Sequence, residues 1–197
     1  KFSLLEDNVL LAQTGYLTIK AVRGTTVTLG YPNREVSVSM ARLYAEAILD
    51  KNAINRAGEG YLADYLEDGN LSAFVEEVNR IVLGIDYQAF PLSSEASCRA
   101  AVFIMVSSSS TLITARCEAH NAHGRSDLEI QTNKNYWVLE FKYCRKGASP
   151  EALLQEAVRQ IKARQYGSQL PQSNLIRAAL VFSQKGRKFT HWAEVWD

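Results

Sequence analysis

The sequence contains little cysteine and no long hydrophobic run. Its 197 residues include three cysteines, at positions 98, 117 and 144. Because this number is odd and the spacing is wide, the cysteines do not indicate a disulfide framework, and they fit a reducing compartment such as the cytoplasm. No stretch of eighteen apolar residues occurs. We therefore expect no segment to span a membrane.

Two familiar catalytic patterns are also missing. The serine run at residues 107–110 has no GxSxG context and does not predict a serine hydrolase. Cys117, His120 and His123 lack the second ligand pair of a zinc site, so we interpret both histidines as loop residues.

Neither an initiator methionine nor a signal-peptide pattern opens the sequence, and we expect it to begin at an internal boundary of a longer protein.

Charge is balanced overall but unevenly distributed. The net charge is +1, yet residues 1–110 carry 9 basic and 13 acidic side chains, whereas residues 111–197 carry 13 basic and 8 acidic ones. The two parts thus differ in sign, at −4 and +5. A modest positive excess in the second part is the direction expected of a surface that binds phosphates.

The chemically most informative stretch runs from residue 124 to residue 142. Two apolar, β-prone runs, at 128–131 and 136–142, are joined by the polar link 132–135, which predicts a β-hairpin. Because side chains alternate along a strand, Glu140 and Lys142 share one face of the second strand. Asp127, at the start of the first strand, can lie beside them. The sequence therefore predicts two carboxylates and one ammonium group at one point.

This arrangement has a chemical use. Two neighbouring carboxylates repel each other, and a hard divalent cation such as Mg²⁺ relieves the repulsion by binding oxygens of both. Such an ion can polarise a phosphate and activate water, while a nearby lysine offsets charge in the transition state. Phosphodiester hydrolysis is the natural reaction class. The structural alternative is that Asp127 is a turn residue and Glu140 faces solvent from an edge strand.

The pattern resembles that of the PD-(D/E)XK nucleases. Asp127 follows Ser126, where the usual motif has proline, and Glu140-x-Lys142 lies on the next hydrophobic strand. The resemblance implies that Asp127, Glu140 and the Phe141 carbonyl bind Mg²⁺, for which Mn²⁺ can substitute, and that Lys142 positions the attacking water. Related nucleases often place an acidic residue that reaches the metal, directly or through water, where Glu95 begins a predicted helix. Helix capping explains Glu95 equally well.

The similarity extends beyond these few residues. Gly124-Arg125-x-Asp127, the strand at 138–142 and Gln160-Ile161-Lys162-x-x-x-Tyr166 resemble a bacterial family in which an AAA-ATPase-like domain precedes the nuclease domain. Residues 11–19 and 29–36 resemble the segment that links the two parts. No Walker motif is present, so the resemblance implies the C-terminal portion of such a protein. Gln160 is the implied contact of the catalytic site or of a phosphate.

Nucleic-acid contacts are expected to be mainly to phosphates, because no helix-turn-helix or zinc finger is recognisable. DNA is the expected partner, with RNA left open, and the other implied partners are the ATPase-like region of the same polypeptide and a second copy in a homodimer. An exposed helix face explains Lys162 and Arg164 as well as phosphate contact does. The residues expected to meet the nucleic acid are Arg125, Arg145, Lys146, Lys162, Arg164 and Tyr166.

The expected fold is a mixed α/β restriction-endonuclease-like core preceded by a small module. Residues 1–88 predict a hairpin (16–21 and 25–31) and helices (3–13, 34–50, 58–67 and 71–83). Residues 89–197 predict the nuclease-like domain in the order αβββαββ, a mixed sheet flanked by helices. Its elements are expected at 95–107, 111–118, 126–131, 136–143, 150–166, 175–182 and 187–195.

Two other classes of function remain open at this point. The chain could keep the nuclease fold without turnover, as a nucleic-acid-binding or regulatory domain. It could also be a protein-interaction domain attached to an AAA-type ATPase, which the helical first part favours. A metal-dependent nuclease is the leading interpretation, because Asp127 and Lys142 are both present.

Overall fold

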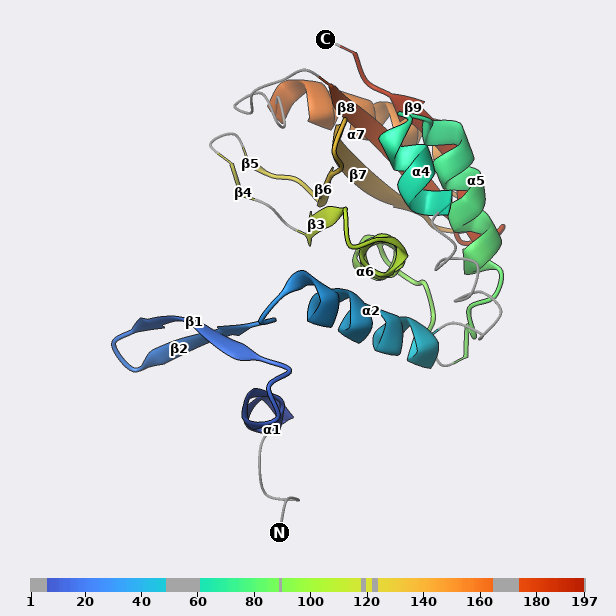
Figure 1. Ribbon diagram of the computed structural model, residues 1–197. Coiled ribbons are helices and arrows are strands. Elements are labelled where there is room, and N and C mark those ends of the chain that lie inside the picture. The colour runs from blue at the N-terminus through green and yellow to red at the C-terminus, as the bar shows by residue number, and fades with distance from the viewer. Residues whose placement is uncertain are drawn as a thin grey trace.

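A five-stranded mixed sheet lies at the centre of the molecule, with the order β3-β6-β7-β8-β9 (Figure 1). The computed structural model describes residues 7–48, 61–88, 90–117, 120–121, 124–164 and 174–196. β7 and β8 are parallel, and the other neighbouring strands are antiparallel. The strands are β3 (Thr114–Cys117), β6 (Leu128–Gln131), β7 (Tyr136–Cys144), β8 (Leu175–Ser183) and β9 (Lys188–Glu194).

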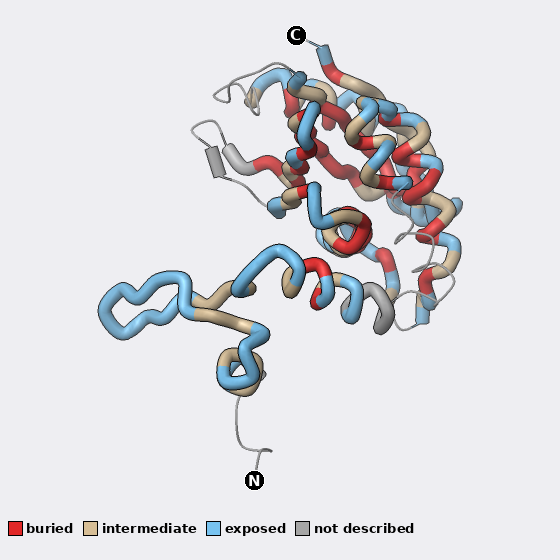
Figure 2. Tube along the Cα trace, viewed as in Figure 1, coloured by how far each residue is buried: buried red, intermediate tan, exposed pale blue. Residues whose placement is uncertain are grey.

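The two faces of the sheet are covered by different helices. On one face, α4 (Tyr61–Glu67), α5 (Leu71–Val82) and α6 (Glu95–Ser109) form the larger core with Trp137, Leu139 and Phe141 of β7. On the other face, α7 (Pro150–Arg164) packs on a smaller cluster that includes Val138. Burial is concentrated in the sheet and in the helices around it (Figure 2). β7 is therefore enclosed from both sides, which explains its almost continuous apolar run.

Local capping explains where the two helices beside the site begin. Ser94 and Ser97 form a reciprocal capping box at the start of α6. Ser149 accepts a hydrogen bond from the backbone of Ala152 at the start of α7, where proline occupies the first helical position. α6 extends two residues beyond the expected end at 107. The hydroxyls of Ser108 and Ser109 donate to carbonyls one turn back, which allows these serines to remain helical.

The N-terminal elements are α1 (Asp7–Gln13), the hairpin of β1 (Thr18–Arg23) and β2 (Thr26–Gly30), and α2 (Arg34–Ile48). The hairpin projects away from the sheet and is largely exposed (Figures 1 and 2). α2 lies beside α6, and two of its arginines connect it to the core. Arg34 Nη2 is 2.6 Å from Thr114 Oγ1, and Arg42 Nε is 3.3 Å from the Ser108 carbonyl oxygen.

The predicted fold class is confirmed, including the order αβββαββ. One local expectation is wrong: the segment around His120 is not simply a loop, because β4 (His120–Asn121) and β5 (Gly124–Arg125) pair as a short antiparallel ladder. Two-residue strands have no readable alternation, so the pattern gave no sign of them. None of the three cysteines, all of which lie within the described residues, forms a disulfide. In the described segments, no helix is both long and apolar enough to cross a membrane.

The helices before residue 88 share a core with the sheet that follows. Leu62, Leu66 and Phe74 belong to the same buried cluster as Trp137. The Leu66 carbonyl also accepts a hydrogen bond of 2.9 Å from the Trp137 indole. The domain boundary at residues 88 and 89 stays a prediction, but α4 and α5 support the sheet directly.

Replacement of Asn135 tests this connection between α4 and the β6–β7 turn. The buried Asn135 amide donates to the carbonyls of Leu66 and Glu67 at 2.9 and 2.8 Å. Asn135→Ala leaves both carbonyls without this donor, so we expect the free energy of unfolding to fall by about 2 kcal/mol. Urea denaturation measures it. Asn133→Ala, in the same turn but exposed, is the control; equal losses in both variants would contradict the role of Asn135.

Candidate active site

The pairing of β6 with β7 brings the two predicted carboxylates together. Leu128 lies opposite Leu139, so the same antiparallel register places Asp127, just before β6, opposite Glu140. Asp127 Oδ2 accepts a hydrogen bond of 2.9 Å from the backbone N–H of Phe141. Asp127 is therefore held against the strand that carries Glu140 and Lys142.

An arginine from α6 holds the other oxygen of Asp127. Arg99 Nη1 lies 2.9 Å from Asp127 Oδ1, and both side chains are mostly buried. A charge-assisted hydrogen bond of this length is stronger than a neutral one. The aspartate is thus oriented from two directions, by the backbone of β7 and by a cation on the helix.

Lys142 connects the strand to α7. Its ammonium nitrogen lies 3.6 Å from Glu140 Oε1, 3.0 Å from Gln160 Oε1 and 3.7 Å from Glu156 Oε1. Glu156 and Gln160 are four residues apart on one face of α7, and Arg164 follows four residues later. The buried neighbours Ala157 and Ile161 fix that face against the sheet. The helix therefore presents three polar side chains on one stripe toward the strand.

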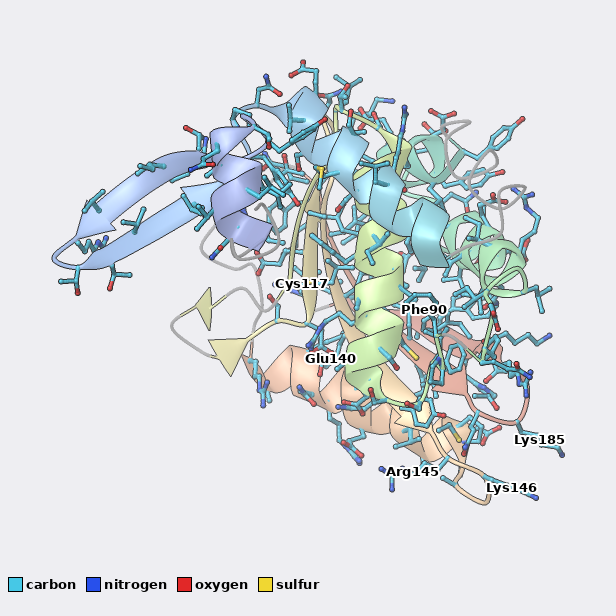
Figure 3. The ribbon with its side chains drawn as sticks, turned by 90° about the horizontal axis from the view of Figure 1, so that it is seen from below. Phe90, Cys117, Glu140, Arg145, Lys146 and Lys185 are labelled. Atoms are coloured by element: carbon cyan, nitrogen blue, oxygen red, sulfur yellow. The ribbon has the colours of Figure 1, made fainter. Side chains whose placement is uncertain are left out.

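Glu140, which is labelled in Figure 3, differs most from an ordinary glutamate in its burial, its pKa and its hydrogen bonding. Its side chain is only 3% exposed. Burial raises its pKa to about 7, repulsion by Asp127 adds to the shift, and the charges of Lys142 and Arg164 oppose it. Among the described residues, Glu140 Oε2 is the buried side-chain oxygen that finds no hydrogen-bond partner. Such an orphaned oxygen is costly unless something else binds it.

The residues present fit a hard divalent cation. Asp127 and Glu140 offer carboxylate oxygens, the ligands that Mg²⁺ and Mn²⁺ favour, and Glu140 Oε2 has no competing donor within the described structure. Over the described ranges, no three His, Cys, Asp or Glu side chains gather as a metal-binding group. Mg²⁺ commonly takes only one or two carboxylates and completes its shell with water and phosphate oxygens, so two suffice.

Four of the predicted residues thus lie together: Asp127, Glu140, Lys142 and Gln160. Phe141 contributes its N–H to Asp127, while its ring belongs to the core on the other face. Glu95 is exposed in the first turn of α6. Arg99, one turn further along, is the α6 side chain whose contact with Asp127 is established. The proposed ligand roles of Phe141 and Glu95 stay predictions.

The residues predicted to meet nucleic acid have different positions. Arg164 is close enough to lower the pKa of Glu140, and Lys162 is exposed on α7. Arg125 belongs to β5, but its side chain lies outside the described structure, as does all of Tyr166. Their contacts with nucleic acid stay predictions.

Two residues of the site were missed by sequence reasoning. Arg99 reaches Asp127 across 28 residues of sequence, and no local pattern signals that contact. Glu156 could have been found, because it precedes Gln160 by one helical turn on the polar stripe of α7. The stripe at 156, 160 and 164 lies next to the buried pair at 157 and 161. That spacing predicts which side chains face the strand.

Ser126, which stands where the usual motif has proline, has its own role. It is fully buried, and its hydroxyl donates a hydrogen bond of 2.7 Å to Glu129 Oε1. The phenol of Tyr136 binds the other oxygen of Glu129. Both oxygens of this third carboxylate are therefore already hydrogen-bonded, which distinguishes Glu129 from the unsatisfied Glu140. A proline at 126 could not supply that hydroxyl.

The raised pKa of Glu140 predicts a pH-dependent stability. Between about pH 4.5 and pH 7 the folded protein holds a proton on Glu140 that the unfolded chain has released, so stability falls as the pH rises through this range. Glu140→Gln removes this loss. In EDTA at pH 8 we expect the variant to be more stable than the parent by on the order of 2 kcal/mol, with a smaller difference at pH 5.

Thermal unfolding at both pH values measures this difference. Glu76→Gln, an exposed carboxylate on α5, is the control and should change little at either pH. A Glu140→Gln variant that is destabilised equally at pH 5 and pH 8 would show that Glu140 is not a strained buried charge.

Comparison with known proteins identifies the family. The family model described as the PD-(D/E)XK nuclease superfamily matches residues 93–192, just over half of the chain. A search of curated proteins found no significant match. The matched segment begins just before α6, ends within β9, and contains Asp127, Glu140, Lys142 and Gln160. Nucleases of this superfamily generally use divalent metals. The chain belongs to the PD-(D/E)XK nuclease superfamily.

Proposed function

We propose that this chain is a metal-dependent nuclease domain that hydrolyses phosphodiester bonds of DNA. The observation that carries the proposal is the buried Glu140, whose Oε2 lacks a hydrogen bond within the described structure, next to Asp127 and 3.6 Å from the Lys142 ammonium. A structural ion pair would satisfy its carboxylate fully. A site that awaits a cation leaves one oxygen open.

Each residue has a distinct task in this proposal. Asp127 and Glu140 hold Mg²⁺ or Mn²⁺, which when bound polarises the phosphate and activates water. Arg99 and the Phe141 N–H keep Asp127 in place before the cation arrives. Lys142, oriented by Gln160, faces the reacting water and offsets negative charge in the transition state. Burial of the site strengthens these electrostatic effects.

A second proposed role belongs to the N-terminal β1–β2 hairpin: contact with the ATPase-like region of a longer polypeptide. This hairpin exposes apolar side chains that a monomeric surface would normally bury, with Ile19 and Val22 each 61% exposed. Exposed apolar residues on a projecting hairpin are typical of an interaction surface. This role is independent of catalysis.

Metal binding can be measured without any substrate. Mn²⁺ at about 100 times its Kd should raise the melting temperature by roughly 5 °C, because it binds the folded state only. Asp127→Ala/Glu140→Ala should abolish the rise, since both carboxylate ligands are lost. Asp64→Ala/Glu76→Ala, two exposed carboxylates on α4 and α5, is the control. An unchanged response of the first double variant would place the metal elsewhere.

A DNA-cleavage assay distinguishes an active nuclease from a domain that keeps the nuclease fold without turnover. The parent protein should nick supercoiled DNA with Mg²⁺ or Mn²⁺ and not with EDTA. Lys142→Ala should still bind metal and DNA yet cleave about 100-fold more slowly or worse, because the lysine acts on the transition state and is not a ligand. Lys134→Ala, an exposed lysine in the β6–β7 turn, should cleave normally.

The alternatives have their own outcomes. If the parent protein cleaves RNA but not DNA with either metal, the substrate is RNA. Cleavage of neither would favour a regulatory domain. Normal cleavage by Lys142→Ala would remove this lysine from the mechanism.

A further inference from the structure

Two exposed segments at one end of the sheet carry five cations. Residues 145–149 follow β7, residues 184–187 form the turn that leads into β9, and Lys188 is the first residue of β9; all ten are exposed. The sequence has no acidic residue between Lys142 and Pro150 or between Ala178 and Ala193. We name the five cations the basic end of the sheet: Arg145, Lys146, Lys185, Arg187 and Lys188.

Backbone and side-chain hydrogen bonds join the two segments. Cys144 pairs with Ser183 where the parallel strands end, and the Gln184 N–H donates to the Cys144 carbonyl at 2.9 Å. The Lys146 N–H donates in turn to Gln184 Oε1 at 3.1 Å. Arg145, Lys146 and Lys185 point outward at this end of the molecule (Figure 3). The positive charges therefore belong to one surface built on the sheet.

The guanidinium group of Arg187 stacks on an aromatic ring. Its guanidinium carbon lies 4.8 Å from the centre of the Tyr87 ring, and the Tyr87 hydroxyl donates to the Arg187 carbonyl at 3.2 Å. Arg187 also has a left-handed backbone, with φ of 49°, which tertiary contacts must maintain. Asp86, next to Tyr87 in the sequence, accepts a hydrogen bond from the Gln88 N–H, and Glu151, which follows residues 145–149, binds His191.

β7 leads directly from the candidate active site to this surface. Glu140 and Arg145 are five residues apart on an extended chain, a span of roughly 16 Å. One strand of duplex DNA has a phosphate about every 3.4 Å along the axis, so this span corresponds to about five base pairs. A phosphate backbone bound at the site would therefore meet the basic end about five base pairs away.

We propose that the basic end of the sheet binds the phosphate backbone of the nucleic acid whose cleavage is proposed above, and this inference rests on that function. Arg145, Lys146, Lys185, Arg187 and Lys188 contact phosphates about five base pairs from the scissile bond. They give affinity without base recognition, because lysine and arginine on exposed turns neutralise phosphates of any sequence. We assign a polynucleotide as the ligand of this surface because the surface adjoins the proposed phosphodiesterase site.

The test compares two variants with equal loss of charge. The first is Arg145→Gln/Lys146→Gln/Lys185→Gln/Lys188→Gln, which keeps Arg187 and its stacking. The control replaces four exposed cations elsewhere: Lys20→Gln/Arg23→Gln/Lys134→Gln/Arg159→Gln. Fluorescence anisotropy with a labelled 20-base-pair duplex in EDTA measures binding over a range of salt concentrations, and circular dichroism verifies folding of each variant.

We expect the first variant to bind at least ~10-fold more weakly than the control at 100 mM salt. Its salt slope should be shallower by about 3.6, which corresponds to four lost phosphate contacts. Equal binding by the two folded variants would overturn the proposal. So would equally tight, equally salt-dependent binding of polyglutamate by the parent, because the surface would then recognise any polyanion, including an acidic protein segment.

Cleavage distinguishes this inference from the proposed function. If the parent cleaves DNA and the first variant binds and cleaves like the control, the surface is wrong and the nuclease stands. If neither DNA nor RNA is cleaved but the first variant loses duplex binding, the surface stands and the nuclease fails.

Discussion

The antiparallel register between β6 and β7 is the constraint on which the site depends. Leu128 opposite Leu139 and Ile130 opposite Trp137 place four buried side chains on the core face. The same pairing puts Asp127 opposite Glu140 on the other. A slip of one residue would turn the apolar residues of β6 away from the core, so the large hydrophobic cluster enforces the geometry of the carboxylates. The geometry of the candidate site and the packing of the core are therefore set by one alignment.

The charges of the site leave one of its two carboxylates without full compensation. Asp127 is compensated by Arg99, whereas Glu140 shares Lys142 with Glu156 and keeps one oxygen open. Burial makes the negative form of Glu140 costly in the absence of a cation. A divalent ion relieves that cost. In the proposed function, the surrounding cations then face the negative charge of a phosphate backbone.

The sequence predicted those parts of the structure that depend on short-range patterns. The alternation of β7 places Glu140 and Lys142 on one face, and Ser149-Pro150-Glu151 predicts the start of α7; the structure confirms both expectations. The mixed five-stranded sheet follows from the order of the elements.

Contacts between distant elements could not be predicted in this way. Arg99 meets Asp127 because α6 packs on the larger core, beside the sheet. The sharing of that core by α4 and α5 depends likewise on tertiary packing, through Leu66 and Asn135. The short β4–β5 ladder is too brief for any periodicity. Long-range packing thus completes a site that local patterns only outline.

The most direct test of the metal-dependent site is anomalous X-ray scattering from crystals of this chain soaked in Mn²⁺. We expect an anomalous peak between the carboxylates of Asp127 and Glu140, within ordinary Mn–O coordination distance of both. Glu140 Oε2 should be among its ligands. A strong peak bound by other residues, with Glu140 still without a partner at full Mn²⁺ occupancy, would contradict the account.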